Sequence, residues 1–409
     1  MEKTLNYSAG ATLTVLEPRR IMKIECLQLR SPHATPDDCD GAVDTAVIRV
    51  TADNGEFGIG ETDAPPNAIA ALLETPTAHI WSRSIRDLLL GENPLDVERL
   101  WDKVYEGTIY HGRRGLGIML MSAIDIALHD LRGKLLRVPA YRMLGGAARP
   151  EVTPYATLFP SMPQNRPWSE MRAACVGLME KALKTGFNAV KMEMLFYDLV
   201  TDRELVAFIH ECRKLVGEQT EFMIDVGYRW KNYNEALWVL ERIEDDKLFF
   251  VETPLHTDDL DGLRRLADAT ITPVAVGEFL QTRHEFRELM DDGHCDIIQP
   301  DMGRVGGLTE AIRCAQMAMD RGRYCVPHAW KTGLTVAATR HFASAVPNCP
   351  YAEYFHPDLF PSFLRPKLAK PEPELKDGKW ALPEAPGLGI QLDEGIVKQS
   401  LVGPITVVA

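Results

Sequence analysis

Apolar residues recur along residues 153–355 in eight short runs, and stretches with helical spacing separate them. In chain order the runs are TPYATLF, NAVKMEM, EFMIDVGY, LFFVETPL, PVAVGEFL, CDIIQPDM, YCVPHAW and PYAEYF. The stretches between them include NYNEALWVLERIED and TEAIRCAQMAMDRG. Strand–helix alternation repeated eight times predicts a (β/α)8 TIM-type barrel. A doubly wound open sheet is the competing fold, but it would need a glycine-rich phosphate turn after its first strand, which this sequence lacks.

The first 150 residues follow a different pattern. Residues 21–30 and 45–62 resemble paired strands, with a hairpin signal at Asp53-Asn54-Gly55. Residues 115–136 carry apolar positions at helical spacing and end in basic residues. We therefore expect an α+β domain over residues 1–150 and the barrel over 151–356. The tail, 357–409, is rich in proline and glycine and too short for a core of its own, so it is expected to pack on the N-terminal domain.

The composition narrows the function classes. The 409 residues include 45 basic and 58 acidic side chains, a net charge of -13, which disfavours binding to nucleic acid or to an anionic membrane. The eight cysteines are dispersed without a CxxC pair, which is typical of reduced thiols. The N-terminus lacks the apolar run of a secretory signal, and no stretch approaches the about 18 apolar residues of a membrane span. These features predict a cytoplasmic protein.

Ionisable residues stand at the ends of seven of the predicted strands. They are Lys191 and Glu193, then Asp225, Glu252, Glu278, Asp301, His328 and Glu353, which follow one another at intervals of 23 to 27 residues from Asp225 onwards. A single acid after a strand is most often a helix cap or a solvated loop residue. In a barrel, however, the set would surround one mouth, which is where active sites of this fold lie.

Three of these acids predict a metal site. Asp225, Glu252 and Glu278 each emerge from an apolar run, and three converging carboxylates would repel one another in a site of low dielectric constant. A hard divalent cation resolves the repulsion, and Mg2+ prefers oxygen ligands. The nitrogen and sulfur ligands that favour zinc are not interleaved with these acids.

Two further pairs are candidate site elements. Asp301 and His328 end neighbouring predicted strands, so the carboxylate can bond one imidazole nitrogen and raise the basicity of the ring, although a lone histidine is more often structural. Lys191 and Glu193 lie two residues apart and share one face of their strand. They are either an ordinary ion pair or parts of the same site.

The sequence resembles the enolase superfamily, in particular its mandelate racemase-like subgroup. The resemblance lies in SAIDIALHDLRGKLLRVPAYRMLGG, FNAVKME, MIDVG, VETPL, VGE, IIQPDMGRVGGLTEA, PHAW and AEY. It implies a modified barrel under a capping domain built from the N- and C-terminal segments. It also implies one Mg2+ per subunit on Asp225, Glu252 and Glu278, and an assembly of identical subunits.

The resemblance further implies abstraction of the proton α to the carboxylate of a small-molecule substrate. His328 would be the general base and Asp301 its partner. Lys191 would be the cation that faces the substrate carboxylate, and Glu353 a hydrogen-bond donor or orienting group near it. A cation and Mg2+ stabilise the enediolate as it forms, and the superfamily uses a lysine or histidine base with Mg2+.

Departures from the subgroup pattern guide the choice of reaction. Glu193 stands where the second lysine of a Lys-x-Lys pair is the opposing base, Gly227 where asparagine is common, and His129 where tryptophan is common, a packing variation. A racemase needs a base on each face of the α-carbon, whereas one histidine can both take the α-proton and protonate a leaving β-hydroxyl. We therefore expect a sugar-acid dehydratase that acts on an aldonate or aldarate. A racemase or epimerase is the alternative, and a catalytically inert metal-binding barrel is the alternative outside enzymes.

Polar loops are expected to contact the distal part of the substrate. The candidates are His33 in SPHATPDD, His111 and Arg113 in YHGRRG, and Arg229 or Trp230 in YRWKN, together with the loop ETDAPPN. Such loops suit a polyhydroxylated substrate better than an aromatic one. Each of them is equally compatible with a plain surface loop, and Trp230 with a core position.

Overall fold

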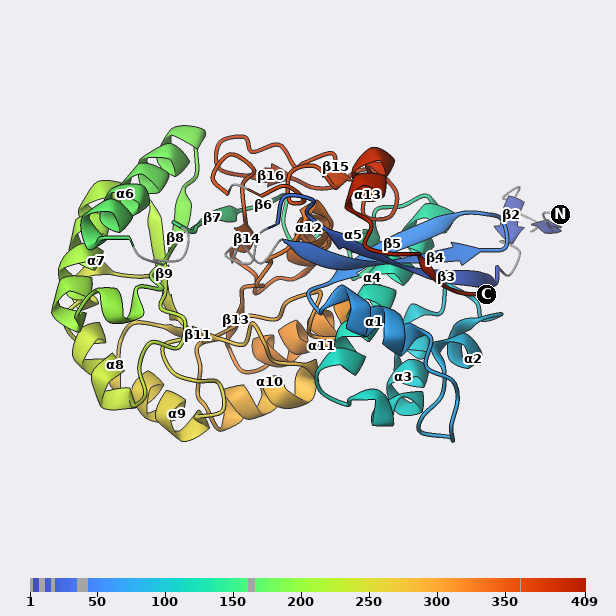
Figure 1. The fold of residues 1–409 in the computed structure, drawn as a ribbon, viewed down its shortest axis with the longest axis horizontal. Helices are drawn as coiled ribbons and strands as arrows, with labels where there is room; N and C mark the ends of the chain where they lie inside the picture. The colour runs from blue at the N-terminus through green and yellow to red at the C-terminus, as the bar shows by residue number, and fades with distance from the viewer. Residues whose placement is uncertain (1–2, 7–11, 16–18, 35–42, 161–165, 361) are drawn as a thin grey trace.

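The eight strands predicted over residues 153–355 form one parallel sheet in the computed structural model (Figure 1), which describes residues 3–6, 12–15, 19–34, 43–160, 166–360 and 362–409. They are β7 Pro154–Leu158, β8 Ala189–Glu193, β9 Glu221–Asp225, β10 Phe250–Glu252, β11 Val274–Val276, β12 Ile297–Ile298, β13 Tyr324–Cys325 and β14 Ala352–Tyr354. The strand order is β13-β12-β11-β10-β9-β8-β7-β14. The last strand, β14, pairs with the first, β7, so the sheet curls round on itself. β13 and β14 lie at its two edges. The predicted barrel is confirmed, in a modified form.

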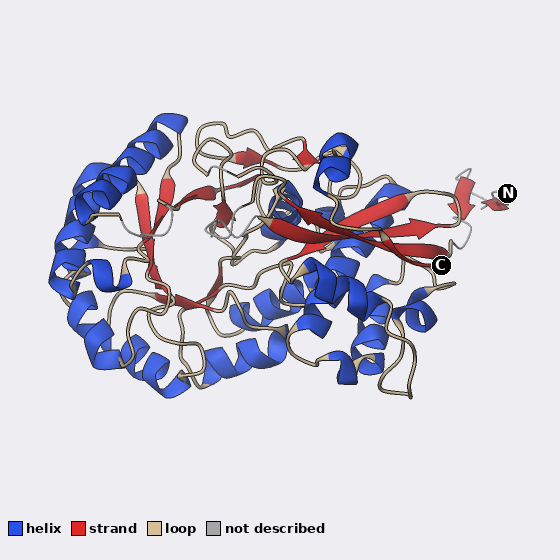
Figure 2. Ribbon diagram, in the orientation of Figure 1, coloured by secondary structure: helices blue, strands red, loops and turns tan. Residues whose placement is uncertain are grey.

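Helices wrap the outside of the curled sheet (Figure 2). They are α6 Trp168–Thr185, α7 Asp202–Val216, α8 Tyr233–Leu240, α9 Leu260–Ala269, α10 Thr282–Asp291, α11 Gly307–Met319 and α12 Gly333–Ala345. Local signals set several of their starts. A capping box between Thr201 and Glu204 begins α7, and the Asn232 side chain accepts from two backbone N–H groups at the start of α8.

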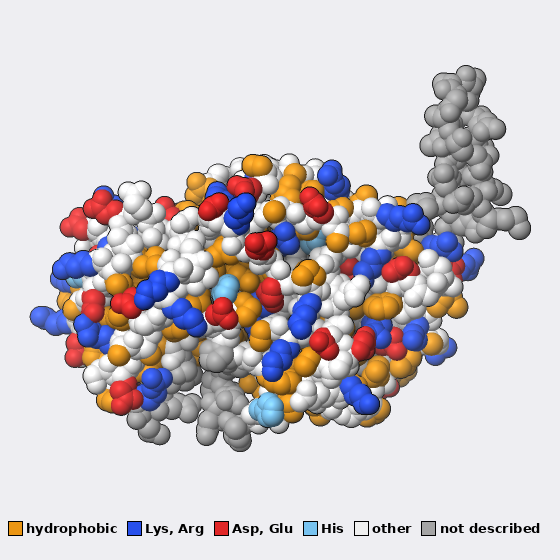
Figure 3. Space-filling view, turned by 90° about the horizontal axis from the view of Figure 1, so that it is seen from above, with side chains coloured by type: hydrophobic (Ala, Val, Ile, Leu, Met, Phe, Trp, Pro, Cys, Tyr) orange, Lys and Arg blue, Asp and Glu red, His pale blue; other side chains and the backbone are white. Residues whose placement is uncertain are grey.

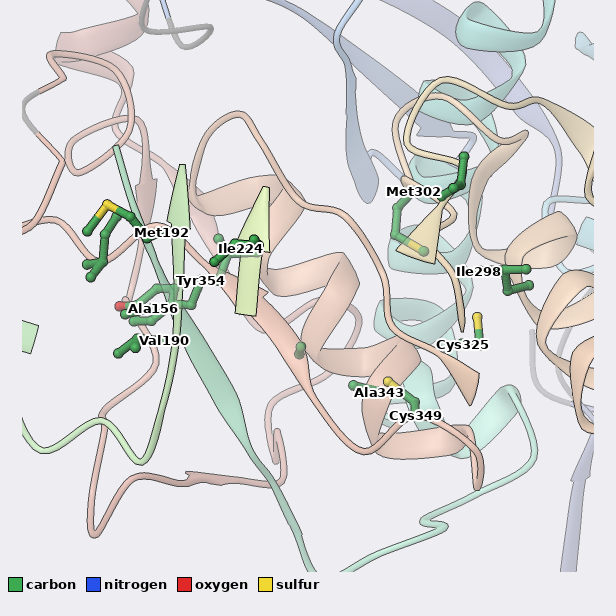
Figure 4. Close-up of a cluster of buried hydrophobic side chains, with 14 of the residues drawn as sticks. Ala156, Val190, Met192, Ile224, Ile298, Met302, Cys325, Ala343, Cys349 and Tyr354 are labelled. Atoms are coloured by element: carbon green, nitrogen blue, oxygen red, sulfur yellow. The ribbon is translucent and has the colours of Figure 1, made fainter. Parts of the chain in front are cut away.

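The two faces of the sheet carry different side chains because residues in a strand alternate in direction. Val190, Met192 and Ile224 belong to the large cluster of buried side chains seen in Figure 4. Ala189 and Met223 belong to a separate, smaller buried cluster with Tyr155, Phe250, Ala275, Ile297 and Val326. The alternation along β8 therefore turns Lys191 and Glu193 to the same side as Ala189, into the barrel.

The capping domain combines both ends of the chain, as predicted. Its antiparallel sheet has the order β18-β3-β4-β5, from Thr406–Val408, Ile21–Arg30, Asp44–Ala52 and Phe57–Thr62. The predicted hairpin is present, with Thr51 opposite Phe57. The helices of this domain are α1 Pro66–Leu73, α2 Ile85–Leu89, α3 Val97–Gly107, α4 Leu116–Leu136 and α5 Ala140–Met143. The boundaries at residues 150 and 356 remain predictions.

Glycines let α4 approach the cap sheet closely. A Cβ atom at Gly58 would lie 2.0 Å from the carbonyl oxygen of Ala127, and one at Gly60 would lie 2.1 Å from that of Ala123. Only glycine fits these two positions of β5. This close packing against α4 holds the end of β5 in place. The residue that follows β5, Asp63, contacts the barrel domain at Arg304. His129 on α4 is fully buried and lies 2.9 Å from the Thr309 hydroxyl, in agreement with a packing role.

The remaining elements are short. They are β1 Lys3–Asn6, β2 Thr12–Val15, β6 Glu151–Val152, β15 Ala369–Lys370, β16 Trp380–Ala381, β17 Gln391–Leu392, α13 Glu394–Ser400, and the 3-10 turns η1 Ile109–His111, η2 Tyr197–Leu199 and η3 Glu244–Asp246. The cysteines in the described part of the chain are free. Within the same residues, no helix combines the length and apolar character needed to cross a membrane. Basic and acidic side chains are interspersed over the face seen in Figure 3.

Candidate active site

The register of the sheet brings the strand-end acids together. Glu193 on β8 lies directly opposite Asp225 on β9, and Asp225 lies opposite Glu252 on β10. Glu278 follows the end of β11 by two residues, and Asp301 and His328 follow the ends of β12 and β13 by three. The predicted candidates from the strand ends therefore surround one mouth, at the carboxyl ends of the strands.

Lys191 is the central cation of this mouth. Its side chain is buried, and Nζ lies 2.8 Å from Glu252 Oε2 and 2.8 Å from Glu353 Oε1. Glu193 Oε1 lies 3.5 Å from the same nitrogen, and Asp225 Oδ2 lies 3.9 Å away. Burial alone would lower the pKa of Lys191, but the surrounding carboxylates raise it well above its usual value. The ammonium thus balances part of the negative charge of the acids.

The acids around Lys191 differ in the direction in which their pKa values shift. Burial raises the pKa of Glu193 well above its usual value, with a further contribution from Asp225, and burial raises the pKa of Glu252 to about 8 against the opposing effect of Lys191. Burial acts in the same direction on Glu353, but Lys191 and His328 lower its pKa below the usual value. Glu353 is accordingly a carboxylate that accepts from Thr157 Oγ1 at 2.5 Å and from the backbone N–H of Ala329 at 2.7 Å. This favours its orienting role over that of a hydrogen-bond donor.

Asp301 and His328 form the predicted pair. Nδ1 of His328 lies 2.6 Å from Asp301 Oδ2, and both side chains are almost completely buried. Nε2 of His328 lies 3.3 Å from Glu278 Oε2. Burial and Arg304 lower the pKa of His328, but Glu353 and Asp301 outweigh them and raise it to about 9. One ring nitrogen is therefore fixed by a carboxylate, and the other faces the acids of the mouth.

The three predicted metal ligands each use one carboxylate oxygen in an internal hydrogen bond. Asp225 Oδ1 accepts from the backbone N–H of Gly227, Glu252 Oε2 accepts from Lys191, and Glu278 Oε1 accepts from the Tyr228 hydroxyl. The second oxygen of Glu252 is buried and has no hydrogen-bond partner among the described residues.

The donor set fits a hard divalent cation, because it consists of carboxylate oxygens and includes a buried oxygen without a partner. In the present side-chain arrangement, the described residues contain no cluster of three or more His, Cys, Asp or Glu side chains placed to hold a metal ion. The carboxylates of Asp225, Glu252 and Glu278 would therefore have to rearrange to hold the ion.

Several contacts in the mouth come from residues that the sequence patterns did not single out. Arg304 Nη1 lies 3.5 Å from Glu278 Oε2, and Gln299 Nε2 donates to Glu252 Oε2 at 2.6 Å. The position of Gln299, two residues before Asp301, was a usable signal, since the two share one face of an extended segment. Arg304 lies in IIQPDMGRVGGLTEA, one of the stretches that carry the resemblance, but the apolar pattern does not define the course of its loop.

The predicted substrate-binding residues lie in different surroundings. His33 is exposed and packs edge-on against Phe363. Arg113 is exposed in the loop that follows η1. His111, at the end of η1, forms a hydrogen bond between its Nε2 and Ser82 Oγ at 3.1 Å. The next residues of this loop rest on the loop after β11, where Gln281 Nε2 donates to the carbonyl of Gly115 at 3.2 Å.

Arg229 and Trp230 both bind Asp202, at the start of α7. Arg229 Nε lies 2.8 Å from Asp202 Oδ1, and its terminal nitrogens donate to the carbonyls of Tyr197 and Val200. Trp230 is 3% exposed and its Nε1 donates to Asp202 Oδ2 at 3.2 Å, which places it in the core. Neither has a described contact with the strand-end acids, and a role of either in substrate binding remains a prediction.

An aromatic cluster flanks His328. Trp330 lies parallel to the His328 ring, with centroids 6.4 Å apart, and packs edge-on against Phe159, Phe355 and Phe360. These side chains form a buried apolar group together with Leu195. They give the dyad a low-dielectric flank, which strengthens the interaction between the imidazole and its carboxylate.

Family comparisons agree with this architecture. Residues 21–145 match the N-terminal domain of mandelate racemase and muconate lactonizing enzyme, and residues 174–396 match the enolase C-terminal domain-like family. The protein belongs to the mandelate racemase/muconate lactonizing enzyme family of the enolase superfamily. It is therefore an enzyme of a family that acts on small carboxylate substrates and typically depends on Mg2+.

Individual relatives narrow the comparison. The chain is 31% identical to the arabinonate dehydratase of Saccharolobus solfataricus, over 87% of this chain and 90% of that protein. It is 32% identical to the L-rhamnonate dehydratase of Saccharopolyspora erythraea, over 85% and 83%. A solved structure whose assignment as a racemase is provisional is 37% identical, with a TM-score of 0.88, over 93% of this chain and 97% of that chain.

Proposed function

We propose that the protein is an Mg2+-dependent sugar-acid dehydratase that converts an aldonate or aldarate into a 2-keto-3-deoxy acid. The observation that carries the proposal is the single histidine base: Asp301 fixes Nδ1 of His328, and Nε2 faces the mouth. Glu193 occupies the position of a second lysine base and lies 3.5 Å from Lys191 instead. The names of the two dehydratase relatives support the same reaction.

The reaction follows from the two nitrogens of His328. In the neutral form of the ring, Nε2 takes the proton from the α-carbon of the substrate, and Asp301 stabilises the imidazolium that results. The imidazolium then returns this proton to the β-hydroxyl group, which leaves as water while the α–β double bond forms. The enol product tautomerises to the 2-keto-3-deoxy acid. A single base thus serves both steps on one face of the substrate.

The other strand-end residues would hold the substrate carboxylate. Asp225, Glu252 and Glu278 would hold Mg2+, which supplies positive charge to offset the negative charge that develops as the α-proton leaves. Lys191 would add a second positive charge, and its contacts with Glu252 and Glu353 fix its direction. Glu353 orients the backbone next to the base through its bond with the N–H of Ala329.

A racemase or epimerase is the second candidate. The 37% identical structure with a provisional racemase assignment favours it, as does the presence of a lysine in the same mouth as the histidine. A two-base mechanism would require Lys191 to release a proton while it lies 2.8 Å from both Glu252 and Glu353. Two carboxylates at this distance strongly favour the protonated ammonium, so the geometry favours elimination.

A panel of mono- and diacid sugars, incubated with the protein and Mg2+, tests the proposal. We expect a semicarbazide-reactive keto acid from at least one of them, together with α-proton exchange in D2O, and neither from a His328→Asn variant. Racemisation or epimerisation without keto product would favour the second candidate. Absence of both exchange and product across the panel would favour an inert metal-binding barrel.

A further inference from the structure

The tripeptide Glu61-Thr62-Asp63 of the capping domain contacts the loops that carry both members of the dyad. Further contacts of the cap with these loops run from Trp101 and Ser122 to Gly306 and from Asp44 to Lys331. Glu61 and Thr62 end β5 and are fully buried, and the side chain of Asp63 is 17% exposed. The two contacted segments are the Asp301 loop, defined as residues 301–307, and the His328 loop, defined as residues 328–332. Each begins with a member of the dyad and leads into a helix, α11 or α12.

Thr62 and Asp63 hold the Asp301 loop. Oγ1 of Thr62 donates to the carbonyl of Gly303 at 2.7 Å, and Gly303 N–H donates to Asp301 Oδ1 at 2.6 Å. Asp63 Oδ2 accepts from Arg304 Nε at 2.8 Å. A Cβ atom at Gly303 would lie 3.4 Å from the Glu61 carbonyl oxygen, which shows how closely this loop approaches the end of β5. Gly303 thus links Thr62 of the cap to the Asp301 carboxylate through two successive hydrogen bonds.

Glu61 and Asp63 hold the His328 loop. Asp63 Oδ1 lies 2.7 Å from Lys331 Nζ. Glu61 Oε1 accepts from the backbone N–H groups of Thr332 and Thr335, at 3.2 and 2.7 Å. It therefore caps the N-terminus of α12, where a negative charge is favourable.

Asp63 connects the two loops directly, because it binds Arg304 from the Asp301 loop and Lys331 from the His328 loop. A bond of 2.6 Å between His328 and Asp301 exists only while these loops keep a fixed separation. We propose that Glu61-Thr62-Asp63 is a positioning element that sets the Asp301–His328 distance from the capping domain. The roles of Asp301 and His328 in this inference rest on the proposed function.

Docking of the cap is the simpler alternative, and a second buried cap carboxylate provides the control. Asp130 accepts from the backbone N–H groups of Ile59 and Leu388, at 2.9 and 2.8 Å, and so ties the cap to the C-terminal tail. None of its described hydrogen bonds reaches either loop. Asp63→Asn, Thr62→Val and Asp130→Asn each preserve side-chain shape. Thr62→Val removes the bond to Gly303 and a longer one from the N–H of Ala64, at 3.4 Å, without changing charge, so it remains informative if Asp63→Asn fails to fold.

The first measurement does not depend on activity. The proton shared by His328 and Asp301 is expected to give a low-field proton resonance, identified by its loss in His328→Asn. We expect this resonance to shift or disappear in Asp63→Asn and in Thr62→Val, and to stay unchanged in Asp130→Asn. An unchanged resonance in both tripeptide variants, or an equal change in Asp130→Asn, would overturn the positioning role.

The second measurement separates positioning from substrate contact. With the sugar acid that the panel identifies, we expect Asp63→Asn to lower kcat by about 10- to 100-fold with little change in KM or in the Mg2+ concentration for half-maximal activity. A raised KM at unchanged kcat would assign Asp63 to substrate binding and refute the inference. If the wild-type protein turns over no sugar acid, the proposed function fails, while the resonance comparison still decides the positioning role.

Discussion

Nδ1 of His328 lies 2.6 Å from Asp301 Oδ2, while Nε2 of the same ring lies 3.3 Å from Glu278 Oε2. The two nitrogens therefore have separate tasks. One is held by a carboxylate that fixes the orientation and tautomer of the ring, and the other is directed at the acids of the barrel mouth. Because both contacts come from loops that follow neighbouring strands, the relationship depends on the barrel and not on any local motif.

Removal of the imidazole is expected to abolish proton transfer. His328→Asn should lower α-proton exchange in D2O by about 10²- to 10⁴-fold, because it removes the group that accepts the proton. Asp301→Asn keeps the imidazole but loses the charge that stabilises the imidazolium, so exchange should also fall. Proton NMR of the substrate measures both rates. Exchange in His328→Asn at the wild-type rate, with an unchanged unfolding temperature, would rule out this base.

Mg2+ is expected to stabilise the folded protein through the strand-end carboxylates. At a Mg2+ concentration 100 times the Kd, binding to the native state adds about 2.7 kcal/mol to the free energy of unfolding. Thermal unfolding with and without Mg2+ measures the effect. Glu252→Gln should abolish the increase in Tm, because it removes a carboxylate from the site, whereas Asp130→Asn should keep it. An equal increase in Glu252→Gln would place the metal elsewhere.

Glu193 is expected to be dispensable for proton abstraction. Its Oε1 lies 3.5 Å from Lys191 and, among the described residues, has no hydrogen-bond partner. Glu193→Gln keeps its shape and should lower the exchange rate by less than about tenfold, far below the 10²- to 10⁴-fold loss expected for a general base. The same NMR exchange assay compares the two variants. A loss in Glu193→Gln as complete as that in His328→Asn would make Glu193 an essential part of the base machinery.

The fold was accessible from the sequence because its periodic signals are strong. Eight apolar runs alternating with helical patterns correspond to β7 to β14, and the hairpin turn at Asp53-Asn54-Gly55 joins β4 to β5 as predicted. The return of the chain end to the cap was also expected, and β18 pairs with β3. The open seam between β13 and β14 was not predicted, because strand closure depends on tertiary geometry that local spacing does not encode.

The site was partly accessible for the same reason. The ionisable residues at the strand ends converge as soon as the strands pair in register. The strand pattern alone therefore predicts Asp225, Glu252 and Asp301 as site residues. The pairing of Arg304 with Asp63 is not predicted, although Asp63 lies in the candidate loop ETDAPPN, since the two residues meet across 241 residues of sequence. Trp230 shows a residue whose surroundings the sequence does not decide. An aromatic residue after a strand fits a pocket or the core equally well, and the structure places Trp230 in the core.

Asp125 is expected to make the stability of the protein depend on pH. Burial raises its pKa to about 7, although its hydrogen bonds with Thr309 act in the opposite direction. The folded state therefore holds a proton that the unfolded chain releases near pH 4, so the free energy of unfolding should fall between about pH 4 and 7 and level off above, by at most about 4 kcal/mol. Asp125→Asn should remove this part of the pH dependence, as measured by Tm from pH 5 to 8. The pKa of His129 is itself lowered by burial, and its Nε2 lies 3.7 Å from Asp125 Oδ2, so the difference between the two proteins reports the coupled pair. Parallel Tm profiles for wild type and variant would show that Asp125 stays charged in the folded protein.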